Sequence, residues 1–134
     1  LAMARIAAPK VLPSKRASAV RRIRHAIAAE PYMIAGRDRY CTEVIELTRG
    51  QLIVKTGAEG VFAAAVPEIE AGIALKCDDG ATRASEIMMT AVLSNLKVFD
   101  KTTTDELINR LSIPLKNRNG TTVGEIRAAA SLSF

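Results

Sequence analysis

Residues 51–80 read QLIVKTGAEGVFAAAVPEIEAGIALKCDDG, and this stretch decides the fold. Three short runs rich in apolar residues, at 51–56, 61–66 and 72–77, are separated by the turn sequences GAEG and PEIEA. Such runs bounded by Gly and Pro are typical of β-strands, and connections this short join antiparallel neighbours. The stretch therefore predicts a three-stranded antiparallel sheet. Because the runs are apolar on both faces, we expect helices to cover both sides of it.

Helical patterns precede this sheet. Residues 14–30 predict a helix with Ser14 as its N-cap and Pro31 as its end. A loop should follow, and residues 41–50 then predict a short helix in which Gly50 is well placed for the C-cap. The apolar face of the first helix is formed by residues three or four apart, namely Ala17, Val20, Ile23 and Ile27.

Further helical patterns follow the sheet. Residues 81–99 predict a helix, and residues 102–111 predict another, in which Thr103 and Glu106 have the spacing of a capping box. Pro114 should stop the second of these helices, and residues 115–127 should form a loop, a turn and a short closing strand. The fold class is therefore α+β, an antiparallel sheet flanked by helices. The apolar side of the first of these helices comprises Ala84, Ile87, Met88, Ala91 and Val92.

Composition and charge narrow the function classes. The chain has 134 residues, 49% of them apolar, so we expect one domain's worth of structure with an aliphatic core. The net charge is +5, and residues 10–24 carry basic side chains without any acidic one. No aromatic residue is interleaved with them, as a binder of single-stranded nucleic acid would need. A solvated helix face is therefore favoured over nucleic-acid binding, while a basic interaction surface at Arg16–Arg24 stays an alternative.

Membrane and metal sites are also disfavoured. No apolar run approaches the ~20 residues that cross a bilayer, and the first residues lack the pattern of a signal peptide. Cys41, Cys77 and His25 have neither the spacing of a disulfide framework nor that of zinc ligands. We therefore expect no membrane association, no metal ligands in this chain and a cytoplasmic location.

The sequence Lys55-Thr56-Gly57 at the end of the first predicted strand is the main candidate for chemistry. A K-T-G strand beside an S-x-x-K nucleophile is typical of active-serine, penicillin-recognising enzymes. An edge strand offers backbone groups to an extended substrate, and Gly57 permits close approach. The Lys55 cation can bind a carboxylate or favour loss of a proton from a neighbour. The alternative is a lysine that merely sits at a hairpin tip.

Other reactive residues are less convincing. The sequence SNLK at Ser94–Lys97 has the letters of S-x-x-K but lies near the end of a predicted helix, so we interpret it as helix surface. Cys41 is either a small buried residue or a thiol that lines the pocket of Lys55. Three further residues have structural interpretations: packing for Cys77, exposure for His25 and solvation of the hairpin for Glu59.

Four segments together resemble one family in order and in register. They are EPYMIAGRDRYCTE (30–43), IVKTGAEGVFAAAVPE (53–68), AGIALKCDDGATRASE (71–86) and PLKNRNGTTVGEIR (114–127). The chain resembles the Rhizobium-type L-asparaginases, serine-dependent amidohydrolases with a fold like that of serine β-lactamases and penicillin-binding proteins. The resemblance implies hydrolysis of L-asparagine to L-aspartate and ammonia.

The resemblance also implies roles for residues of this chain. Lys55 matches the catalytic K-T-G lysine, and Cys41 matches a cysteine of the substrate pocket, to which Thr56 and Gly57 also belong. The family's S-x-x-K serine, second serine and zinc ligands have no counterpart here, so zinc is expected only in the complete enzyme. Residues 1–8 read as the end of a helix. We therefore expect residues 1–134 to form a single segment, the C-terminal part of a longer asparaginase domain, which is inactive alone and forms a homodimer in the complete enzyme.

Two alternatives stay open from the sequence. One is a non-catalytic module that binds an amino acid or peptide against its edge strand. The other is a different serine amidohydrolase with a β-lactamase-like fold, in which Lys55 would keep its role but the substrate would differ.

Overall fold

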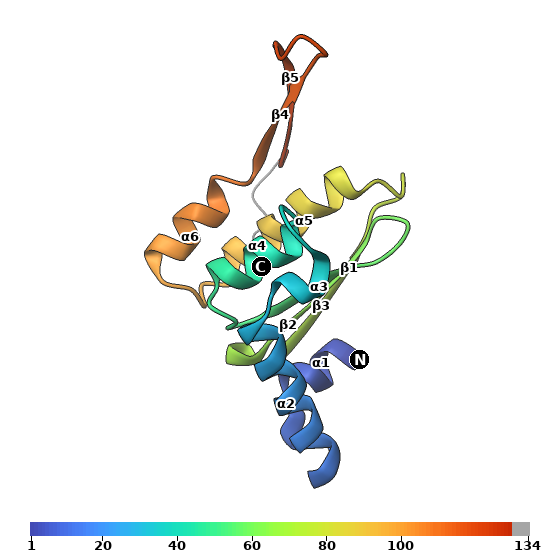
Figure 1. Cartoon of the computed structure of the whole chain (residues 1–134), viewed down its shortest axis with the longest axis vertical. Helices are drawn as coiled ribbons and strands as arrows, with labels where there is room; N and C mark the ends of the chain where they lie inside the picture. The colour runs from blue at the N-terminus through green and yellow to red at the C-terminus, as the bar shows by residue number, and fades with distance from the viewer. Residues whose placement is uncertain (130–134) are drawn as a thin grey trace.

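The computed structural model describes residues 1–129 (Figure 1). Helices and two small antiparallel sheets alternate along the chain, which confirms the α+β class. The elements are α1 (Ala2–Ala7), η1 (Pro9–Val11), α2 (Ser14–Ala29), α3 (Tyr32–Ala35), α4 (Tyr40–Leu47), β1 (Ile53–Thr56), β2 (Val61–Val66), η2 (Pro67–Ile69), β3 (Ala71–Lys76), α5 (Thr82–Asn95), α6 (Lys101–Ile108), β4 (Ser112–Lys116) and β5 (Thr122–Arg127).

The three-stranded sheet has the order β1-β2-β3, as the repeated apolar runs predict. Both pairings are antiparallel, with Lys55 opposite Ala63 and Phe62 opposite Leu75. Val54 and Phe62 are fully buried and belong to a core shared with α4, α5 and α6. Strand β1 is an edge of this sheet, so one side of its backbone pairs with β2 and the other faces away from the sheet.

Helices pack on both faces of the sheet, which confirms the expectation drawn from its apolar runs. Helices α4 and α5 contact β1 and β2 on the side of the core, and α1 contacts β2 and β3 (Figure 1). Gly72 allows α1 to lie directly on β3, because a Cβ atom at Gly72 would be 2.3 Å from the backbone nitrogen of Ala4. Successive strand residues face opposite sides, so Gly72 faces away from its neighbour Ile73, which packs against the core.

The first predicted helix forms as α2, but its details differ from the prediction. Pro13 is the N-cap and Ser14 the first helical residue, without a side-chain capping bond. Ala17 is buried, whereas Ile23 is 58% exposed. The expected loop after it contains α3, because Pro31 suits the first turn of a helix and Gly36, with φ of 92°, ends it.

The helices after the sheet are shorter than predicted. Helix α5 ends at Asn95 with Leu96 as its C-cap, and the next residue, Lys97, has a φ of 55°. The expected capping box at Thr103 and Glu106 is wrong: Asp100 is the N-cap of α6, and its carboxylate accepts a hydrogen bond from the Thr103 amide at 2.7 Å. On α5, Met89 and Leu93 are fully buried whereas Met88 is 40% exposed, so the buried face is rotated from the predicted one.

The region after α6 is a β-hairpin rather than a loop with one closing strand. Helix α6 already ends at Ile108, and Pro114 lies within β4, opposite Glu125 of β5, so the proline is not what stops the helix. Proline is tolerated here because each strand of a two-stranded sheet is an edge. The turn is held by the Asn117 side chain, which accepts hydrogen bonds from the amides of Asn119 and Thr121. The hairpin projects from the rest of the chain (Figure 1).

Among residues 1–129, no helix is long and apolar enough to cross a bilayer.

Candidate functional site

The K-T-G residues lie where β1 leaves the sheet. The Gly57 amide donates to the Val61 carbonyl at 2.7 Å, and hydrogen-bonded pairs alternate along an antiparallel ladder. Lys55 therefore pairs with Ala63 through its backbone, whereas the amide and carbonyl of Thr56 point to the free edge of β1. This is the arrangement by which an edge strand can present backbone groups to another molecule.

The thiol of Cys41 accepts a hydrogen bond from the amide of Thr56 at the free edge of β1. The Thr56 N–H donates to the Cys41 Sγ at 3.3 Å, and Cys41, in the first turn of α4, is only 1% exposed. Burial raises the pKa of the Cys41 thiol, while the Thr56 amide and the Lys55 charge lower it by less. Cys41 is thus a neutral thiol in the ordinary pH range, and its role here is to accept a hydrogen bond rather than to attack a substrate.

The ammonium group of Lys55 binds the other backbone group of Thr56 at the free edge, its carbonyl. Lys55 Nζ donates to the Thr56 carbonyl at 2.9 Å, and the lysine side chain is exposed. Lys55, Thr56 and Cys41 therefore meet at one point of the sheet edge, and Gly57 follows immediately in the exposed turn. We call this group the K-T-G edge.

The turn between β1 and β2, which follows the K-T-G edge, packs against the turn that follows β3. Gly60 has a φ of 67°, and a Cβ atom there would lie 3.0 Å from both the Cys77 Cβ and the Gly80 carbonyl carbon. The Cys77 amide donates to the Gly60 carbonyl at 3.0 Å. The Glu59 side chain lies beside Gly80, so in this structure it supports the contact between the two turns.

The other reactive residues have structural surroundings. Ser94 donates its hydroxyl to the Ala91 carbonyl of its own helix at 3.1 Å, in agreement with its interpretation as helix surface. Cys77 is buried, with its Sγ 3.3 Å from the Met88 Sδ. His25 is exposed on α2.

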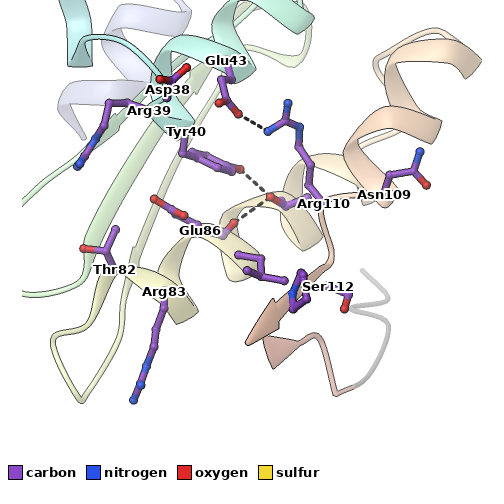
Figure 2. Close-up of a pocket in the computed structure, with 13 residues that line it drawn as sticks. Asp38, Arg39, Tyr40, Glu43, Thr82, Arg83, Glu86, Asn109, Arg110 and Ser112 are labelled. Atoms are coloured by element: carbon purple, nitrogen blue, oxygen red, sulfur yellow. Dashed lines mark hydrogen bonds and ion pairs between the residues drawn. The ribbon is translucent and has the colours of Figure 1, made fainter. Parts of the chain in front are cut away.

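A charged cleft of about 600 Å³ lies beside α4 and α5 (Figure 2). Sequence reasoning did not identify it, because its residues come from three distant parts of the chain. One sequence feature points toward the cleft: two of its lining residues, Arg39 and Tyr40, directly precede the candidate pocket residue Cys41. The lining residues are Asp38, Arg39, Tyr40, Glu43, Thr82, Arg83, Glu86, Thr90, Asn109, Arg110, Ser112, Ile113 and Pro114.

Two sets of interactions fix the walls of this cleft. The Tyr40 hydroxyl and Thr90 Oγ1 share a hydrogen bond of 2.8 Å, and Thr90 also donates to the Glu86 carbonyl at 2.9 Å. The Tyr40 ring packs edge-on against Phe62 of β2, with the ring centroids 5.4 Å apart. Just after α6, Arg110 donates to the Glu43 carboxylate at 2.5 Å. Through its contacts with Thr90 and Phe62, Tyr40 connects the wall of the cleft to the sheet.

Burial dominates the ionisation of the cleft. It raises the pKa of Tyr40 far above its ordinary value, so the hydroxyl is neutral. Burial also raises the pKa of the Glu86 carboxyl, which the positive charge of Arg39 lowers and the negative charge of Glu43 raises further. A carboxylate at Glu86 is therefore less stable than one in water, and a nearby cation would stabilise it.

The described residues, 1–129, do not form a zinc site. Within residues 1–129, no three His, Cys, Asp or Glu side chains are grouped so that they could hold a metal ion. Of the two cysteines, Cys41 accepts the Thr56 amide and Cys77 lies against Met88. The zinc that the resemblance implies for the complete enzyme therefore has no ligand set in the described part of this chain.

The family model for L-asparaginase II matches residues 1–128, which include both the K-T-G edge and the charged cleft. No curated protein matches the chain.

Proposed function

Because the chain belongs to the L-asparaginase II family, we propose that it forms one wall of a site that hydrolyses L-asparagine to L-aspartate and ammonia. The observation that supports this most is the K-T-G edge, where Lys55, Thr56 and Cys41 meet on the free side of β1. In this proposal the enzyme is of the serine-dependent Rhizobium type, with a fold like that of penicillin-binding proteins. Residues 1–134 form the C-terminal part of its domain.

The proposed reaction has two stages. A serine from an S-x-x-K segment attacks the side-chain amide of asparagine, so that an O–C bond forms, the C–N bond breaks and protonated nitrogen leaves as ammonia. Water then hydrolyses the ester to give aspartate and restore the serine hydroxyl. Ser94 does not serve as this nucleophile, because its hydroxyl is bound to the Ala91 carbonyl within α5.

Lys55 supplies the cation in this scheme. Its side chain is exposed. Within residues 1–129, its ammonium donates a hydrogen bond to the Thr56 carbonyl and to no other group. It can therefore turn toward a serine or a substrate carboxylate without breaking a buried contact. Placed beside the serine, a positive charge favours the negative charge that develops on its oxygen during attack.

Thr56, Gly57 and Cys41 shape the pocket in this proposal. The Cys41 thiol holds the Thr56 amide, and this bond fixes the edge along which the substrate would lie. Gly57 is exposed and has no side chain to obstruct close approach to the backbone. The partner is thus the small-molecule substrate, whereas nucleic acid, membrane and zinc have no assigned role for these residues.

Turnover measurements test this function. The enzyme that contains this chain together with its S-x-x-K segment should release ammonia from L-asparagine, and the purified 134-residue chain should not. Binding of asparagine without turnover by the complete enzyme would instead indicate the non-catalytic module, and preference for another amide would indicate a different amidohydrolase. Light scattering of the same enzyme tests the predicted homodimer.

A further inference from the structure

The charged cleft contains a cation and an anion that do not pair with each other. Among residues 1–129, neither Arg39 nor Glu86 takes part in an ion pair, whereas Glu43 and Arg110 form one at 2.5 Å. The charge of Arg39 nevertheless lowers the pKa of Glu86, so the two side chains are near enough to influence each other. Both line the same cleft, which therefore holds two opposite charges that influence each other without forming an ion pair.

These two side chains line the same cleft but come from different helices. Arg39 is the N-cap of α4, and Glu86 lies in the first half of α5. Figure 2 shows both extending on the same side of the cleft, away from the Glu43–Arg110 pair. The nearby Tyr40 hydroxyl is already bonded to Thr90, so it does not neutralise either charge.

We propose that this cleft binds the zwitterionic end of a free α-amino acid at a site separate from the K-T-G edge. The ligand's carboxylate would bind the guanidinium of Arg39, whose paired N–H groups match the two oxygens of a carboxylate. Its ammonium would bind the half-buried carboxylate of Glu86, replacing the water lost to burial. The remainder of the roughly 600 Å³ leaves room for the ligand's side chain.

The cleft is connected to the K-T-G edge through consecutive residues. Arg39, Tyr40 and Cys41 follow one another at the start of α4, and Cys41 holds the Thr56 amide at 3.3 Å. An amino acid bound at Arg39 would therefore restrain the segment that fixes the edge of β1. Neither Lys55 nor Thr56 lines the cleft, so this inference is independent of the catalytic role proposed for Lys55.

Calorimetric titration of the 134-residue chain with L-aspartate tests this site. The wild-type chain should bind it, whereas N-acetyl-L-aspartate, which lacks the ammonium, should bind at least about tenfold more weakly. Arg39→Gln and Glu86→Gln should each weaken L-aspartate binding by a similar factor. Two charge-matched controls, Arg118→Gln in the hairpin and Glu106→Gln on α6, should bind like the wild type because neither residue lines the cleft.

A Lys55→Ala chain separates the two sites. It should keep its affinity for L-aspartate, even though the same change should strongly lower turnover in the complete enzyme. The inference is overturned if the wild-type chain gives no binding heat, or if N-acetylation leaves the affinity unchanged. It is also overturned if Lys55→Ala abolishes binding while folded Arg39→Gln and Glu86→Gln chains, checked by circular dichroism, still bind normally.

Discussion

Replacement of Cys41 by alanine tests how the K-T-G edge is held in place. The Cys41 Sγ accepts the Thr56 amide at 3.3 Å, and the thiol is almost fully buried in the core that includes Val44 and Phe62. Because the Thr56 amide faces away from β2, no strand partner can replace this acceptor. Cys41→Ala therefore leaves the amide without a partner and opens a small space at the start of α4.

The expected loss of stability follows from these two effects. A partly buried amide left without a partner costs about 1–3 kcal/mol. Removal of one buried atom the size of a methylene costs roughly 0.8 kcal/mol more. Water can reach this edge, because Thr56 is only half-buried, so the amide term should lie at its lower end. We therefore expect Cys41→Ala to lower the free energy of unfolding by about 2 kcal/mol.

Amide hydrogen exchange measured by NMR gives the most specific readout. In the wild-type chain the Thr56 amide should be protected, and in Cys41→Ala it should exchange at least about tenfold faster. The Lys55 amide, paired with β2, should change much less. Cys41→Ser should restore protection through its hydroxyl oxygen. As a control, Cys77→Ala removes a buried sulfur near Met88 and should leave Thr56 protected. Equal Thr56 exchange in wild-type and Cys41→Ala chains would refute the reasoning.

Three further predictions concern packing and pH. Gly72→Ala should lower the free energy of unfolding by about 1–3 kcal/mol in chemical denaturation, since its Cβ would meet the backbone of α1, whereas the exposed Gly124→Ala should cost less. Glu86→Gln should raise stability at pH 7, because the folded-state pKa of Glu86 is raised and its charge opposes folding; this gain should disappear below the unfolded-state pKa, as thermal melts across pH will show. Asp100→Asn should lower stability near neutral pH, because the pKa of this N-cap is lowered; the difference should vanish as pH falls through the folded-state pKa. An increase in the Glu86→Gln gain at low pH would contradict its part of the account.

The sheet could be predicted from the sequence because its signals are local. Residues 51–80 contain the strands and turns in order, and the structure confirms the three strands and both antiparallel pairings between them. The failures lie where a tertiary contact decides the outcome. From the sequence Pro114 predicts a helix stop, but it lies within β4, because either strand of a two-stranded hairpin is an edge that tolerates proline. The N-cap of α6 is Asp100 rather than the predicted Thr103, because the Asp100 carboxylate accepts a hydrogen bond from the Thr103 amide.

The candidate site was only partly visible for the same reason. Lys55, Thr56 and Gly57 form a contiguous motif, so the sequence alone could indicate them. The residues alone left the place of Cys41 open between a buried core position and the pocket of Lys55, since its contact with Thr56 spans 15 positions. The charged cleft combines residues from α4, α5 and the end of α6, and no short motif links Glu43 with Arg110, which lies 67 positions away.

The turnover number of Lys55 variants tests the central claim most directly. In the enzyme that combines this chain with its S-x-x-K segment, ammonia release from saturating L-asparagine should fall by about 10²–10⁴-fold in Lys55→Ala. Lys55→Arg, which keeps the charge, should retain more activity than Lys55→Ala. Lys97→Ala, in the exposed segment after α5, should match the wild type. Near wild-type turnover by folded Lys55→Ala would contradict the assignment of Lys55 to the active site.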